Sequence, residues 1–240
     1  MNTNYSENNC VTLIGKVASD KRLSHETFGE KFYLFDLEVM RLSDIADIIP
    51  ITVSERLLTD FDLSIGNQII VDGQFRSYNN YENEKNRLVL TVFAKDIQEY
   101  DKVKEQEEST EQEGEENEGT EKKSEVTNEI ILIGYICKKP IYRQTPFGRE
   151  IADILLAVNR AYNKSDYIPC IAWGRNARFC QNIEVGTEIK ITGRIQSRTY
   201  EKKFEDGTSE TRVAYEISIA SMEVIQENEA ADEETSEVEE

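Results

Sequence analysis

Histidine and paired cysteine motifs are scarce in this chain of 240 residues, and long apolar runs are absent. The single histidine, His25, leaves little material for acid–base or metal chemistry. None of the four cysteines stands in a Cys-x-x-Cys pair, which favours reduced thiols over a zinc site or disulfides. They are Cys10, Cys137, Cys170 and Cys180. We therefore expect no metal and no cofactor.

Targeting and catalytic motifs are missing as well. No apolar run approaches the ~18 residues that a membrane-spanning helix needs. The opening residues MNTNYSENN have neither the basic nor the apolar region of a signal peptide. The chain also contains no G-x-S-x-G, H-E-x-x-H or phosphate-loop motif. The sequence thus predicts a cytoplasmic protein that does not contact membranes and is not an enzyme.

Positive charge is in short supply, since the net charge is −19, and such a balance ordinarily argues against a nucleic-acid partner. Its distribution changes that conclusion. Residues 101–127 and 227–240 supply −15 of the −19, whereas residues 128–226 carry +2. Both acidic runs are poor in apolar residues, so we expect a disordered linker and a disordered tail.

The two segments outside these runs resemble each other at a constant offset of 119 residues. The tripeptide LIG at 13–15 falls on LIG at 132–134, FG at 28–29 on FG at 147–148, and IP at 49–50 on IP at 168–169. One inserted residue later, IGNQIIVDGQF matches VGTEIKITGRI. We therefore predict two copies of one domain at 9–100 and 128–226, with the linker at 101–127 and the tail at 227–240.

The apolar pattern within each copy has mostly a period of two. In EIKITGRIQSR, Ile189, Ile191 and Ile195 alternate with polar residues, as a half-buried strand requires. Gly73 and Gly193 fall inside such strands, where glycine marks a bulge, a bend or a close backbone approach.

A helical spacing interrupts the strands in the second copy, and the repeat implies a short helix at the same place in the first. Ala177, Cys180 and Ile183 are spaced for a short helix between Gly174 and Gly186, and Gly186 is the expected C-terminal cap. Five strands with a short helix after the third are typical of the oligonucleotide-binding (OB) barrel. The predicted fold class is all-β, with two tandem OB-fold five-stranded barrels.

Aromatic and basic residues are interleaved in the second copy. Alternation places Tyr167 and Trp173 on the outer side of one strand, and Tyr162 in the loop before it. On a neighbouring strand, one parity collects Lys190, Arg194, Arg198 and Tyr200. Unpaired bases stack on aromatic rings, each stack worth about 1–3 kcal/mol, and phosphates bind Lys and Arg. The pattern favours single-stranded nucleic acid; the alternative is that these rings pack in a core or a dimer interface.

The second copy resembles a known family. The stretches NEIILIGYICKKPIYRQTPFG, ADILLAVNRAY, DYIPCIAWGRNARF and VGTEIKITGRIQSRTYE are similar, in order, to the bacterial single-stranded DNA-binding protein family. The resemblance implies that the stacking rings are Tyr162, Tyr167, Trp173 and Tyr200. It implies that the basic contacts are Arg143, Arg160, Arg194 and Arg198. Lys190 and Arg175 join this set because they share the strand face or adjoin Trp173 in sequence.

The first copy departs from this pattern. Ser43, Ile48 and Ser54 stand where the second copy has Tyr162, Tyr167 and Trp173, respectively. The residues that remain are Arg41, Arg76 and Tyr81, the last at the position of Tyr200. We expect this copy to bind DNA weakly and to serve mainly in association.

The resemblance implies sequence-independent binding and protection of single-stranded DNA in bacterial replication, recombination and repair. It also implies a homodimer with four barrels. The tail ENEAADEETSEVEE lacks the family's Pro-Phe tip, which leaves docking of replication and repair proteins open. A second interpretation is an accessory subunit that acts through protein contacts at the primosome or the recombination machinery. RNA remains a third candidate ligand, because stacking alone does not distinguish ribose from deoxyribose.

Overall fold

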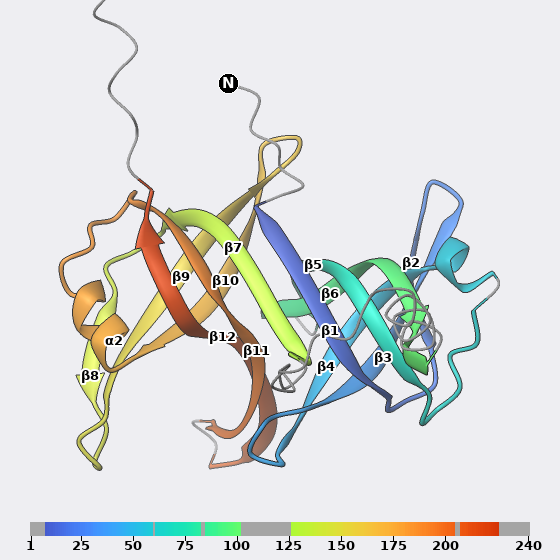
Figure 1. The fold of residues 1–240 in the computed structure, drawn as a ribbon, viewed down its shortest axis with the longest axis horizontal. Helices are drawn as coiled ribbons and strands as arrows, with labels where there is room; N and C mark the ends of the chain where they lie inside the picture. Colours follow the sequence, from blue (N-terminus) through green and yellow to red (C-terminus); the bar gives the residue numbers. More distant parts are fainter. Residues whose placement is uncertain (1–7, 60, 83–84, 102–125, 205–206, 226–240) are drawn as a thin grey trace, which may run out of the picture.

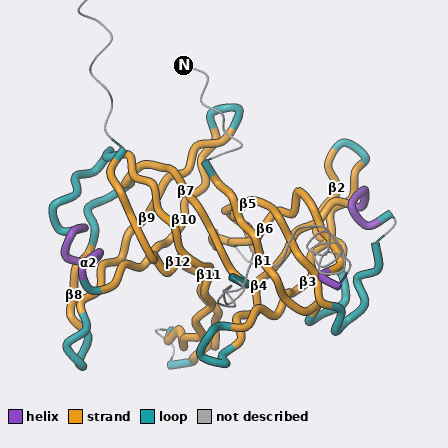
Figure 2. Tube along the Cα trace, viewed as in Figure 1, coloured by secondary structure: helices purple, strands orange, loops and turns teal. Residues whose placement is uncertain are grey.

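A computed structural model describes residues 8–59, 61–82, 85–101, 126–204 and 207–225. Within these ranges the chain forms two barrels that lie side by side (Figure 1). Helical residues are confined to short turns at the periphery of the barrels (Figure 2). Most of the predicted linker and the whole predicted tail, residues 227–240, lie outside the described residues.

The first barrel is closed by strand pairing. Its strands follow the order β3-β4-β6-β5-β1, and β1 pairs back with β3. The β4–β6 pairing is parallel and the others are antiparallel. The elements are β1 (Asn9–Val17), β2 (Arg22–Thr27), β3 (Glu30–Met40), β4 (Ala46–Ser54), the 3-10 turn η1 (Glu55–Leu58), β5 (Gln68–Glu82) and β6 (Lys85–Glu99).

The second barrel repeats this topology. Its order is β7-β11-β12-β10-β9, closed by β7–β9, again with one parallel pairing between β10 and β12. The elements are β7 (Asn128–Ile136), β8 (Ile141–Gln144), β9 (Glu150–Arg160), β10 (Lys164–Trp173), α2 (Arg175–Cys180), β11 (Glu188–Lys203) and β12 (Ser209–Val224).

The short strands β2 and β8 are continuations of broken first strands. β1 pairs with β3 at Lys16↔Glu38, and β2 continues along β3 from Arg22↔Leu34. β7 and β8 line up along β9 in the same way. Each barrel therefore has five strands, and the prediction of tandem OB-fold barrels is confirmed.

Local features explain how the strands close. The ladder shifts register at Gly73 and at Gly193, as the sequence indicated. A side chain at Gly193 would overlap the carbonyl of Ser218 on the paired strand, so only glycine allows this close approach. The predicted cap at Gly186 is wrong, because α2 already ends at Cys180 and the Gly186 N–H donates to the carbonyl of Ile136 at 2.9 Å.

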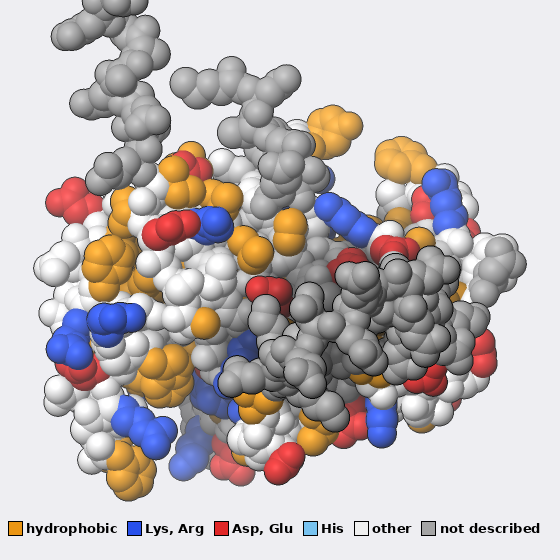
Figure 3. Space-filling view, in the orientation of Figure 1, with side chains coloured by type: hydrophobic (Ala, Val, Ile, Leu, Met, Phe, Trp, Pro, Cys, Tyr) orange, Lys and Arg blue, Asp and Glu red, His pale blue; other side chains and the backbone are white. Residues whose placement is uncertain are grey.

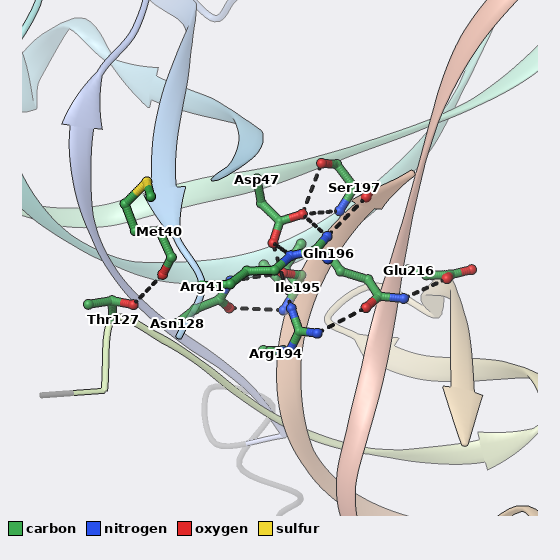
Figure 4. A network of polar contacts seen from close by, with 10 residues as sticks. All are labelled: Met40, Arg41, Asp47, Thr127, Asn128, Arg194, Ile195, Gln196, Ser197 and Glu216. Carbon is green, nitrogen blue, oxygen red and sulfur yellow. Dashed lines mark hydrogen bonds and ion pairs between the residues drawn. The ribbon is translucent and has the colours of Figure 1, made fainter. Parts of the chain in front are cut away.

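The two barrels meet through antiparallel pairing of β1 with β7. Asn9 pairs with Leu132, Leu13 pairs with Asn128, and Val11 faces Ile130 at the centre. Asn9 and Asn128 occupy the same place in the repeat, so the contact has the form of an isologous dimer interface within one chain. The two asparagine side chains repeat the symmetry: Asn9 hydrogen-bonds the backbone of Phe75 at 2.8 and 2.9 Å, and Asn128 hydrogen-bonds that of Ile195 at the same two distances. Figure 4 shows the contacts of Asn128 with Ile195.

Candidate nucleic-acid interface

Tyr162 stands at the tip of the β9–β10 hairpin. Lys164 pairs with Arg160, which leaves three residues in the turn. Tyr162 adopts φ 62°, a left-handed conformation that a bulky side chain rarely takes. Tyr162 is 94 % exposed. The backbone thus holds a large ring in solvent at a local cost in conformational energy.

Tyr167 and Trp173 project from the outer side of β10. Between them the inward residues Ile168, Cys170 and Ala172 are buried in the barrel core. Tyr167 is 48 % and Trp173 38 % exposed. Trp173 stands six positions after Tyr167, an even number, so the two rings share a face and lie about 20 Å apart along the strand. The structure therefore brings Tyr162, Tyr167 and Trp173 onto one hairpin.

Cross-strand neighbours add to this face. Tyr135 pairs with Ala157, which pairs with Tyr167, so the two tyrosines lie in one row about 10 Å apart. In the same way, the register places Arg143 in one row with Trp173, with a single residue of β9 between them. Sequence reasoning missed Tyr135, because the register that aligns β7 with β10 is set by tertiary pairing.

Phe147 lies beyond the Trp173 end of this face, in the turn between β8 and β9. Phe147 is 92 % exposed. The turn is held by hydrogen bonds from Gly148 N to Thr145 O at 2.8 Å and from Arg149 N to Thr145 Oγ1 at 3.0 Å. Figure 3 shows hydrophobic side chains projecting at the ends of the hairpins. An aromatic residue inside the Pro-Phe-Gly turn was the sequence signal for this ring, which the sequence analysis treated only as a marker of the repeat.

Tyr200 lies on a different hairpin, formed by β11 and β12. It is 37 % exposed, and the guanidinium of Arg198 lies 5.7 Å from the centre of its ring. Further along, Lys202 and Arg212 lie 5.5 and 5.8 Å from the ring of Phe204. Aromatic rings and cations therefore alternate along this hairpin too.

Most of the predicted cations have carboxylate partners in the folded chain. The ion pairs are Arg143–Asp153 at 2.9 Å, Arg160–Asp166 at 3.5 Å, Lys190–Glu223 at 3.6 Å and Arg194–Asp47 at 3.7 Å. Arg175 and Arg198 form no ion pair with a residue that the structure describes. Lys164, next to the Tyr162 turn, is exposed and likewise has no such pair within the described ranges, although the sequence analysis did not name it.

Arg194 and Arg41 lie at the junction of the two barrels. Arg41 donates two hydrogen bonds of 2.6 Å to the buried carboxylate of Asp47, and the N–H of Ser197 donates to the same carboxylate at 2.6 Å (Figure 4). The hydrogen bonds from Arg41 to Asp47 raise the pKa of Arg41, against the effect of burial. Burial alone would raise the pKa of Asp47, but its bonds to Arg41 and Ser197 outweigh burial and lower it.

The equivalent carboxylate of the second copy is held more loosely. Asp166 is fully buried and accepts from the N–H of Ser77 at 2.7 Å, but Arg160 stays 3.5 Å away. Burial therefore prevails and raises the pKa of Asp166, against the effect of Ser77 and the nearby arginines. Arg160 is thus less tightly engaged than Arg41, its counterpart in the first barrel.

The structure places the divergent first-copy positions as follows. Ser43 is exposed in its turn, Ile48 is 40 % exposed, and Ser54 is buried at the end of β4. Arg76 is half-buried, and its guanidinium lies 4.4 Å from the ring centre of Phe93. Tyr81 lies on β5, but its side chain is outside the described part of the structure. Its predicted match to Tyr200 is wrong by one residue, because the equivalent register shifts at Gly73 and Gly193 set an offset of 120, which puts Asn80 at the position of Tyr200.

Among the described residues, no group of three or more His, Cys, Asp or Glu side chains is placed to hold a metal ion. No helix in those ranges is long and apolar enough to cross a membrane. All four cysteines are described, and none forms a disulfide.

The model of the single-strand binding protein family matches residues 127–225, which is the second copy. The single-stranded DNA-binding protein B of Bacillus subtilis is 34% identical over 86 residues, covering 32% of this chain and 74% of that protein. The chain belongs to the single-strand binding protein family. The single-stranded DNA-binding protein of Clostridium tetani is 40% identical over 88 residues, covering 34% of this chain and 59% of that protein.

The matched segment spans about half the length of several of these relatives, for example 51% of a Listeria innocua and 48% of a second Bacillus subtilis single-stranded DNA-binding protein. Among solved structures, a deletion mutant of the single-stranded DNA binding protein from Thermus aquaticus has a TM-score of 0.68 at 18% identity. The alignment covers 94% of this chain and 98% of the Thermus aquaticus chain. At this identity the likeness supports the tandem fold of both copies.

Proposed function

We propose that this chain binds single-stranded DNA without sequence preference, chiefly through the second barrel. The observation that carries the proposal is the exposure of Tyr162, Tyr167 and Trp173 along one hairpin, with Phe147 at its far end. Rings that protrude in this way offer flat apolar faces that single strands can cover and that duplex DNA, with its bases paired and stacked, cannot. Relatives named single-stranded DNA-binding proteins support the same ligand.

Phosphate contacts would come from two kinds of cation. Arg175, Arg198 and Lys164 are exposed and have no carboxylate partner among the described residues, so they are available at once. Arg143 and Arg160 lie on or beside the ring face, but they form ion pairs with Asp153 and Asp166, respectively. To contact a phosphate, each arginine has to break its ion pair or bind the carboxylate and the phosphate together. We therefore expect the exposed cations to account for most of the salt dependence.

The test uses Trp173, the only tryptophan of the chain. Titration with oligo-dT at several salt concentrations is expected to quench its emission, with affinity falling steeply as salt rises. A duplex of equal length is the control and should quench little. Absence of both quenching and anisotropy change with single strands would overturn the proposal. Matched oligo-rU distinguishes DNA from RNA as the preferred ligand.

Two variants separate stacking from folding. Tyr167→Leu keeps apolar volume but removes the ring, and it is expected to weaken oligo-dT binding about 5- to 150-fold, the range of one lost base stack. Ile65→Ala removes an exposed apolar side chain from the turn before β5 of the first copy and should leave the affinity unchanged. Equal losses in both variants would contradict the site.

The proposal extends to assembly and cellular role. We infer a homodimer that carries four barrels and acts in bacterial replication, recombination and repair in the cytoplasm. Light scattering should give about twice the chain mass of 27.6 kDa. A mass of one chain would overturn the dimer and leave the DNA-binding proposal intact.

A further inference from the structure

The first barrel carries aromatic rings on its outer face at positions other than those of the second barrel. His25 pairs with Phe32, and Phe32 pairs with Ser54, so the three lie in one cross-strand row. In the second barrel the corresponding row contains Ile151 and Trp173. The aromatic residue of the first barrel, Phe32, therefore lies on the neighbouring strand, about 4.8 Å from the position equivalent to Trp173.

Phe32 faces outward. The inward residues of β3 are Phe35, Leu37 and Val39, each almost fully buried, and Phe32 has the opposite parity. It is half-buried, as is Phe93 on β6, and His25 is exposed. The barrel core therefore does not account for these rings.

The rings form a compact group. The imidazole of His25 stacks on Phe32 with centroids 4.8 Å apart and planes 8° from parallel. Phe32 and Phe93 have centroids 5.5 Å apart, and the guanidinium of Arg76 lies 4.4 Å from the centre of Phe93. We call His25, Phe32, Phe93 and Arg76 the first-barrel platform. It combines ring faces with a cation, which is the chemistry that single strands require.

The platform adjoins the second barrel's ring face. Arg76 is followed by Ser77, and the N–H of Tyr167 donates to the hydroxyl of Ser77 at 2.7 Å across the junction. The backbone N–H of Ser77 in turn donates to Asp166, next to Tyr167. A strand lying over Tyr167 would therefore meet Arg76 and Phe93 on leaving the second barrel.

We propose that the first-barrel platform is a second binding site for single-stranded DNA, continuous with the site on the second barrel. This inference rests on the proposed function of the second barrel and changes the expected role of the first. The first copy therefore keeps a binding face, whose rings lie on β2, β3 and β6. One chain then engages one strand with both barrels.

The first experiment places a reporter in the platform of the full-length chain. Trp173→Phe removes the native tryptophan, and Phe32→Trp introduces one between His25 and Phe93. Oligo-dT longer than one barrel's site, which holds about 4–16 nucleotides, is expected to quench this emission. Binding by anisotropy without quenching would overturn the platform and keep the proposed function. Absence of any binding by the unaltered chain would overturn both.

The second experiment measures the length of DNA covered. Phe32→Leu with Phe93→Leu removes both rings and keeps apolar volume, so the barrel should still unfold at nearly the same urea concentration. The nucleotides of poly-dT covered per chain are expected to fall by about 4–16, one barrel's share. Trp173 quenching by a short oligo-dT should change less than two-fold. An unchanged covered length would contradict the platform.

Ile65→Ala is the matched control for this experiment. Ile65 is an exposed apolar residue of the first copy in the turn before β5, outside the platform and outside the turns equivalent to those that carry Phe147 and Tyr162. The variant should leave the covered length unchanged. A loss equal to that of the platform variant would show that the platform is not the site.

Discussion

At the scale of the residue, equivalent carboxylates of the two copies have different surroundings. Asp47 has a bidentate arginine partner, whereas Asp166 has Arg160 at 3.5 Å. The pKa of Asp47 is lowered and that of Asp166 is raised, the latter mainly by burial. A group with a lowered folded-state pKa stabilises the fold above its unfolded pKa, about 3.9 for aspartate, and loses this effect as pH falls. A group with a raised pKa acts in the opposite direction.

Asp47→Asn is therefore expected to cost roughly 3 kcal/mol of unfolding free energy at pH 7, because it leaves the partly buried Arg41 without its counter-charge. The cost should shrink as pH falls through the lowered pKa of Asp47, where the wild-type carboxylate also loses its charge. Urea unfolding at pH 7 and in acid checks this.

Asp166→Asn is the matched variant. It removes a carboxylate whose ionisation the fold disfavours, so it should cost clearly less than Asp47→Asn at pH 7. Equal costs at pH 7, or a cost of Asp47→Asn that persists in acid, would contradict the assigned difference.

At the scale of the element, the register shift at Gly193 shapes the second barrel. β11 turns here from β7 toward the long hairpin with β12 that carries Tyr200. Because a side chain at this position would overlap the backbone of β12, Gly193→Ala should lower the unfolding free energy by about 1–3 kcal/mol through overpacking.

Thr192→Ala is the neighbouring control for Gly193→Ala. It loses one exposed hydroxyl contact with Ser221 and should cost less than about 1 kcal/mol. Urea midpoints of the two variants provide the comparison. A Gly193→Ala protein as stable as the unaltered chain would show that the strands can separate at this point without cost.

At the scale of the whole molecule, net charge and function oppose each other. The chain carries −19, yet the proposed ligand is a polyanion. Residues 227–240 contain eight acidic residues and no basic ones. We expect this segment, as a tethered polyanion, to compete with DNA for the cations of the ring face at a high effective concentration. The competition weakens as salt shortens the screening length to about 8 Å at 0.15 M.

Deletion of residues 227–240 is expected to tighten oligo-dT binding several-fold at about 0.01 M salt and to have little effect near 1 M, where screening is short. Anisotropy titrations at both concentrations measure this. A chain of full length with Gln and Asn in place of the acidic residues should behave like the deletion. Unchanged affinity at low salt in either protein would refute the competition.

The repeat, the fold class and the main ring face could all be predicted from the amino-acid sequence. These follow from local rules, because alternation sets which side chains leave a strand and the common offset of 119 residues reveals the duplication. Alternation and the hairpin turn were sufficient to assign Tyr162, Tyr167 and Trp173 to the outer surface. The spacing of Ala177 and Cys180 also predicted α2, although not where it ends.

Contacts across strands and across the junction, in contrast, are set by the tertiary fold. The offset compared Ser54 with Trp173 and indicated a lost ring, but pairing of β2, β3 and β4 puts His25 and Phe32 in the same row. Likewise, the alternation of residues along β11 predicted that Arg194 is a free cation, whereas the β1–β7 contact places it beside Asp47 of the other barrel. The register of the strands and the contact between the barrels depend on hydrogen bonds between segments far apart in the sequence. They therefore cannot be predicted from the apolar period of a single strand.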